Sequence, residues 1–192
     1  PIAGTFDWHA VPRRYADTAQ ARGVVVPAAF DLAVARADEV QAAFAAAPDP
    51  PVAAHNDLLA ANFLVDGSDK VWLIDWEYAG MNERFFDLGN FAVNNGLDDD
   101  ADEALLEAYF GELTHGRIAR LRLMKVMSDL REAMWGVVQQ AVSTLEVDFV
   151  SYAAEHFDRL LDRAARPGWN RLLADAASGS GLTPRPAGGS RG

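Results

Sequence analysis

Residues 55–87 read HNDLLAANFLVDGSDKVWLIDWEYAGMNERFFD, and this stretch decides how the rest of the chain is interpreted. Residues 63–66 and 71–74 are apolar runs of strand type, and turn-forming Gly, Ser and Asp residues join them. The pattern predicts a β-hairpin. Such a hairpin brings Asn62, just before the first run, beside Asp75, just after the second.

The residues upstream of the hairpin have the spacing H-x-D-x-x-x-x-N, with His55, Asp57 and Asn62 at the specified positions. In protein kinases the Asp of this pattern accepts the proton of the acceptor hydroxyl, the Asn holds magnesium, and a further magnesium-binding Asp follows. Asp75 has the position of that further Asp. The spacing therefore indicates an ATP-dependent phosphotransferase with Asp57 as catalytic base and Asn62 and Asp75 as Mg²⁺ ligands. The alternative interpretation is a surface loop followed by a capped strand.

The surrounding residues resemble the choline/ethanolamine kinases, particularly the bacterial ones, from about residue 50 to about residue 165. The segments that carry the resemblance are HNDLLAANFLVD, LIDWEYAGMNERFFDLGN and MWGVVQQAVSTLEVDFVSYAAEHFD. Aminoglycoside phosphotransferases share the fold but more typically have H-G-D and I-D-F-G or I-D-W-G, whereas Asn56 and Glu77-Tyr78 are similar to the choline kinase form. The resemblance implies phosphoryl transfer from ATP to choline, ethanolamine or a similar small amino alcohol, with Mg²⁺. An amino-sugar acceptor is the alternative.

The resemblance also implies roles for residues beside the motif. Glu77 is expected to be a second carboxylate ligand of the metal. His55 is expected to support the catalytic loop by hydrogen bonding, and Asp87 to accept hydrogen bonds from backbone amides of that loop. For Asp87, a carboxylate that interacts with the dipole of its own helix is the alternative.

Three aromatic residues are implied to line the acceptor site: Tyr78, Trp135 and Tyr152. A quaternary ammonium group cannot donate a hydrogen bond, so its site uses ring faces and nearby carboxylates. Core packing is the alternative interpretation for each ring. The sequence departs from the family at Val138, where eukaryotic members usually have a second Trp, and at Asn94, where a carboxylate is expected.

The expected fold class is α+β and mostly α, namely the C-terminal lobe of a protein-kinase-like fold with a small β-hairpin that carries the metal ligands. Apolar periodicity and capping residues predict the helices. They are expected at residues 13–22, after a capping Asp31, at 85–95, from about 98 to 113, from 116 to about 144, and after a capping Asp148.

Two features of a complete kinase are missing from the residues before His55, namely a glycine-rich loop over the phosphates and a strand lysine. Residues 1–177 are therefore predicted to be a C-terminal lobe, with catalytic loop and acceptor site, that lacks its N-terminal ATP lobe. Residues 178–192, SGSGLTPRPAGGSRG, are predicted to be a disordered tail. A non-catalytic relic or binding domain is the alternative.

The composition agrees with this interpretation. The 192 residues are 50% hydrophobic, which is ample for one core, and their net charge of −11 argues against nucleic acid or an anionic membrane as partner. ATP and a small cationic alcohol are the expected partners. With no cysteine and no apolar run of bilayer length, a soluble cytoplasmic protein is expected.

Overall fold

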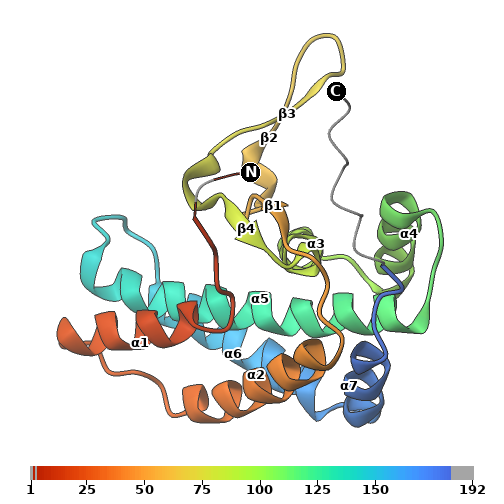
Figure 1. Cartoon of the computed structure of the whole chain (residues 1–192). Coiled ribbons are helices and arrows are strands. Elements are labelled where there is room, and N and C mark those ends of the chain that lie inside the picture. Colours follow the sequence, from red (N-terminus) through yellow and green to blue (C-terminus); the bar gives the residue numbers. More distant parts are fainter. Residues whose placement is uncertain (1, 3, 183–192) are drawn as a thin grey trace, which may run out of the picture.

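The computed structural model describes residue 2 and residues 4–182, and these fold into a mostly helical α+β structure (Figure 1). Two single-turn 3₁₀ helices, at Ala60–Asn62 and Trp76–Tyr78, flank the predicted hairpin. The helices and strands are α1 (Val11–Ala21), α2 (Ala29–Ala46), β1 (Val52–Ala54), β2 (Phe63–Val65), β3 (Val71–Leu73), β4 (Gly80–Asn82), α3 (Arg84–Asn94), α4 (Asp99–Phe110), α5 (His115–Val142), α6 (Phe149–Ala165) and α7 (Trp169–Ala177).

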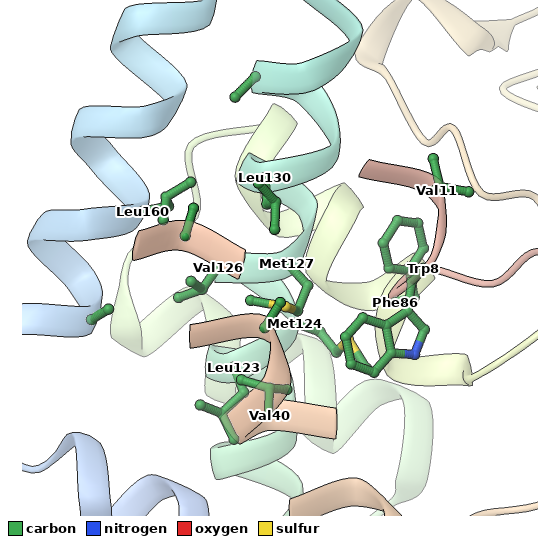
Figure 2. Close-up of a cluster of buried hydrophobic side chains, with 14 of the residues drawn as sticks. Trp8, Val11, Val40, Phe86, Leu123, Met124, Val126, Met127, Leu130 and Leu160 are labelled. Carbon is green, nitrogen blue, oxygen red and sulfur yellow. The ribbon is translucent and has the colours of Figure 1, made fainter. Parts of the chain in front are cut away.

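Helix α5 is the centre of the fold and runs across the middle of the molecule in Figure 1. It packs against α1, α3, α6 and α7, so it is covered on several sides. Its apolar stripe is buried at Leu123, Met127, Leu130, Met134 and Val137. Figure 2 shows several of these side chains in the core with Trp8, Val40 and Phe86. Ala141, which continues the same spacing, is exposed in the final turn of the helix.

Two antiparallel two-stranded sheets lie above α5 and beside α3 in Figure 1. The predicted hairpin is present, and β2 pairs with β3 in the register Phe63 opposite Leu73. The second sheet pairs β1 with β4, with Ala54 opposite Gly80. Because Ala54 pairs with Gly80, residues 55–79 form a long loop whose two ends lie side by side. The periodicity of the sequence does not predict the second sheet, since each strand has only three residues.

The helix termini follow local chemistry in most places. Asp98 caps α4 by accepting the amide of Ala101 at 2.9 Å, and Asp148 caps α6 by accepting the amide of Ser151 at 3.0 Å. The expected capping role of Asp31 is wrong, because α2 already begins at Ala29 and Asp31 lies in its first turn. Helix α4 ends at Phe110, earlier than predicted, because Gly111 adopts φ +78°.

The packed chain continues past the predicted boundary at residue 177. Ser180 is 1% exposed; its hydroxyl donates to Asp49 at 2.7 Å, and its carbonyl accepts from the Arg117 guanidinium at 2.9 Å. Ser180 is therefore packed against the helical body, beyond residue 177. The rest of the predicted tail, residues 183–192, lies outside the described residues.

Within residues 2 and 4–182, no helix is both long and apolar enough to span a membrane.

Candidate active site

Asp87, in the first turn of α3, holds the start of the predicted catalytic loop. One of its carboxylate oxygens accepts the backbone amide of His55 and the other accepts that of Asn56, both at 2.7 Å. Burial raises the pKa of Asp87, and the two amide donors oppose that effect. The side chain thus fixes two consecutive peptide groups that lie 31 and 32 residues earlier in the chain.

Asn56 fixes the loop from inside. Its backbone adopts φ +68°, a left-handed conformation that Asn tolerates better than most residues. Its side-chain amide donates to the carbonyl of Tyr78 at 2.9 Å and accepts from the amide of Asn82 at 2.7 Å. The two ends of the loop 55–79 are therefore joined by side-chain hydrogen bonds as well as by the β1–β4 pairing. No sequence signal identified Asn82 as a site residue.

His55 supports the same loop from its other side. The imidazole Nε2–H donates to the carbonyl of Ile74 at 2.8 Å, which joins the loop to the end of β3. The ring also packs edge-on against Trp76 with centroids 4.8 Å apart. His55 itself is 2% exposed, whereas Trp76 is 51% exposed.

Asp57 lies at the centre of the site and is 7% exposed. Its Oδ1 accepts a hydrogen bond from the guanidinium of Arg131 at 3.1 Å, whereas Oδ2 receives no hydrogen bond within residues 2 and 4–182. Burial raises the pKa of Asp57, Arg131 lowers it, and Glu132 raises it further. One carboxylate oxygen is therefore held and the other is available to a ligand.

Asn62 and Asp75 lie next to each other at the base of the hairpin. The amide of Ile74 donates to the carbonyl of Asn62 at 3.0 Å, and Asp75 follows at once with φ +62°. The side-chain nitrogen of Asn62 donates to the carbonyl of Asp57 at 2.9 Å, so its amide oxygen is directed elsewhere. Asp75 and Glu77 are exposed, and within the described part of the chain their carboxylates have no ion-pair or hydrogen-bond partner.

The side-chain oxygens of Asn62, Asp75 and Glu77 suit magnesium. An amide oxygen and two carboxylates are hard oxygen ligands, and Mg²⁺ is usually held by one or two carboxylates together with water and substrate phosphates. The described residues contain no group of three His, Cys, Asp or Glu side chains close enough to hold a metal ion. The candidate set of Asn62, Asp75 and Glu77 is instead a site with two carboxylates, of the kind that water and substrate phosphates complete.

A buried polar network that the sequence did not reveal joins Asp57 to α5 and α6. The Arg131 guanidinium also donates to Oε1 of Glu132 at 2.6 Å, and the hydroxyl of Tyr152 donates to Oε2 at 2.9 Å. Asn90 of α3 donates to Glu132 at 3.3 Å and accepts the backbone amide of Leu58. The only sequence signal was that Glu132 shares the helix side of Trp135.

The three predicted aromatic residues lie around this network. Trp135 packs edge-on against Tyr152, with centroids 5.8 Å apart. Tyr78 lies on the other side of the Arg131 guanidinium, whose carbon is 4.9 Å from the ring centroid. Burial and Glu132 raise the pKa of Tyr152 well above its ordinary value, so its hydroxyl remains a donor. Trp135 and Tyr152 are brought into contact, and Tyr78 joins them through Arg131 and Glu132.

A separate cavity of about 560 Å³ lies between α4, α5 and α7. None of the predicted site residues lines it, so it is distinct from the site around Asp57.

The fold and this constellation define a kinase-like phosphotransferase. The chain matches the model of the phosphotransferase enzyme family over residues 1–123, and it belongs to that family. Among solved structures, it superposes on a choline/ethanolamine kinase family protein from Mesorhizobium loti with a TM-score of 0.83 and 35% identity, over 93% of this chain and 61% of that one. The choline kinase LicA from Streptococcus pneumoniae shares the fold, with a TM-score of 0.71 at 19% identity over 85% of this chain and 57% of that one.

Curated relatives agree with this assignment. Ethanolamine kinase 2 of Mus musculus is 35% identical over 131 residues, which cover 57% of this chain and 34% of the mouse protein. The predicted resemblance to choline/ethanolamine kinases is confirmed, and both the family and these relatives are small-molecule kinases. The chain spans about a third of the length of the mouse relative that it matches.

Proposed function

We propose that the chain carries the catalytic loop and acceptor site of an ATP-dependent kinase that phosphorylates the hydroxyl of choline, ethanolamine or a similar small amino alcohol. The observation that carries the proposal is Asp57, which is buried and held through one oxygen, with its other oxygen directed toward no protein donor in the described residues. Asp57 is joined to Asn62 at the base of the hairpin through its carbonyl, and to Tyr152 of α6 through Arg131 and Glu132.

Asp57 acts as the base. Its Oδ2 accepts the proton of the acceptor hydroxyl as the hydroxyl oxygen attacks the γ-phosphorus of ATP. Positioning of the reacting groups dominates this reaction. Arg131 positions the Asp57 carboxylate, and Asp87 positions the loop that carries it. Asn62, Asp75 and Glu77 would hold Mg²⁺, which would neutralise charge on the phosphate oxygens.

The acceptor is a small cation. Asp57, Arg131 and Glu132 together carry a net charge of −1, and three aromatic residues adjoin them, so an ammonium group is attracted to the cluster. The relatives, an ethanolamine kinase and a choline/ethanolamine kinase family protein, agree with this chemistry. An amino sugar is the rival acceptor, since its amines would satisfy the same charges.

Residues 1–177 correspond, in this proposal, to a C-terminal lobe that works with an N-terminal ATP lobe. The hairpin projects from the helical body (Figure 1), and its apolar side chains Val65, Val71 and Trp72 are 65%, 59% and 47% exposed. A second lobe that covers this surface would bury them. Without the nucleotide positioned, the isolated chain loses an effect worth roughly 7–11 kcal/mol, so little turnover is expected from it alone.

The test measures ADP release with ethanolamine, choline and kanamycin in parallel. It uses the chain alone and the chain joined to the N-terminal part of the Mesorhizobium relative. Turnover with an amino alcohol by the joined protein, lost in Asp57→Asn but retained in Asp69→Asn, is expected. Asp69 is a matched control because it lies in the hairpin turn at φ +60°, which Asn also tolerates.

Each contrary outcome has a distinct meaning. Turnover with kanamycin alone would defeat the amino-alcohol acceptor, and the absence of turnover in the joined protein would favour the relic. Robust turnover by the isolated chain would refute the two-lobe proposal.

A further inference from the structure

Arg131 is an unusual neighbour for a site that binds a cation. Its side chain is 3% exposed, and its guanidinium bridges Asp57 at 3.1 Å and Glu132 at 2.6 Å. The same guanidinium lies over the ring of Tyr78, with 4.9 Å between its carbon and the ring centroid. A fixed internal cation therefore already occupies one aromatic face of the predicted acceptor site.

The charge on Arg131 is permanent in this setting. Burial opposes that charge, but the carboxylates of Glu132 and Asp57 outweigh burial and raise the pKa of Arg131. Glu132 is itself held by Asn90 and by the hydroxyl of Tyr152. The guanidinium therefore cannot move away from Tyr78 without removing the ion-pair partner of two buried carboxylates, Asp57 and Glu132.

This arrangement affects the two kinds of ammonium differently. A quaternary ammonium donates no hydrogen bond and depends on ring faces, of which that of Tyr78 already binds Arg131. A second cation on that face would be repelled by the first. A primary ammonium can instead donate hydrogen bonds to the carboxylate of Glu132, the member of the cluster that the proposed reaction does not use as base, so it needs the ring less.

We propose that Arg131 is a specificity-determining residue, which makes this site favour an acceptor with a primary ammonium over one with a quaternary ammonium. The proposal rests on the proposed function, because it takes the ammonium of the acceptor to lie beside Tyr78, Trp135 and Tyr152. It goes beyond that function by separating ethanolamine from choline.

The first test uses the whole unmodified chain and calorimetric titration with four ligands: ethanolamine, its N-methyl and N,N-dimethyl derivatives, and choline. Affinity is expected to fall with each added methyl group, by about tenfold in total, because each methyl group removes a hydrogen-bond donor and the Tyr78 face that Arg131 occupies offers no compensating cation–π contact. Choline binding as tightly as ethanolamine, or more tightly, would overturn the proposal while leaving the proposed function intact. Binding of none of the four would overturn both.

The second test compares Arg131→Gln with a matched control, Arg117→Gln. Arg117 is also buried on α5 and lies over an aromatic ring, that of Phe110, at 4.5 Å, but it is outside the site. The ethanolamine-to-choline affinity ratio is expected to shrink to about threefold or less in Arg131→Gln and to be unchanged in the control. An unchanged ratio in a folded Arg131→Gln protein would overturn the proposal. Should that variant fail to fold, the methylation series on the unmodified chain still decides.

Discussion

Replacing Asp87 by Asn should loosen the catalytic loop while leaving the helical body intact. The carboxylate accepts two backbone amides at 2.7 Å, and hydrogen bonds to a charged group contribute about 1.5–3 kcal/mol each. Asn keeps one acceptor oxygen but presents an NH₂ group to the other amide, so one of these bonds is lost and a donor is left without a partner. Because the side chain is only partly buried, we expect a loss of about 2 kcal/mol.

Urea unfolding followed by far-UV circular dichroism measures that loss, and amide hydrogen exchange at His55 and Asn56 reports the loop directly. Asp98→Asn is the matched control, since Asp98 also accepts a backbone amide, at an exposed helix N-cap where Asn is as good as Asp. A change below about 0.5 kcal/mol in Asp87→Asn, with exchange at both amides unaltered, would refute the reasoning.

Three further predictions concern stability. Burial, aided by Asp49, raises the pKa of Glu83 to about 7 against the opposing charge of Arg120. Between its ordinary value and about 7 the folded state binds more protons than the unfolded state, so the free energy of unfolding should fall as pH rises through that window. Glu83→Gln should flatten this dependence in urea titrations at several pH values. Gly89→Ala should destabilise by about 1–3 kcal/mol in thermal unfolding, because its methyl group would lie 2.6 Å from the backbone of Met124 and α3 would have to move off α5. Arg120→Met should cost about 3–5 kcal/mol in urea unfolding, since it leaves the buried carboxylate of Asp49 unpaired; a loss below about 1 kcal/mol would contradict this.

Features set by neighbouring residues could be predicted from the sequence. The hairpin follows from two short apolar runs around a turn, and the caps at Asp98 and Asp148 are local hydrogen bonds. The spacing of Asp57 and Asn62 was also informative, because the 3₁₀ turn between them returns the Asn side chain to the Asp57 carbonyl.

Features that depend on contacts between distant elements could not be predicted. Arg131 and Glu132 read as the polar positions of an amphipathic helix, yet α5 is covered on several sides and buries both. Asn82 and Asn90 each serve the loop through one amide side chain, and no local pattern marks such a partner. The roles of Asn62, Asp75 and Glu77 toward magnesium stay a prediction.

The central claim is that Asp57 directs phosphoryl transfer to the hydroxyl of an amino alcohol. Its most direct test is ³¹P NMR of the products formed from ATP, Mg²⁺ and ethanolamine by the chain joined to an ATP lobe. The account predicts a phosphomonoester resonance of phosphoethanolamine that is absent with Asp57→Asn. Release of inorganic phosphate alone, or formation of the ester at an unchanged rate by Asp57→Asn, would contradict it.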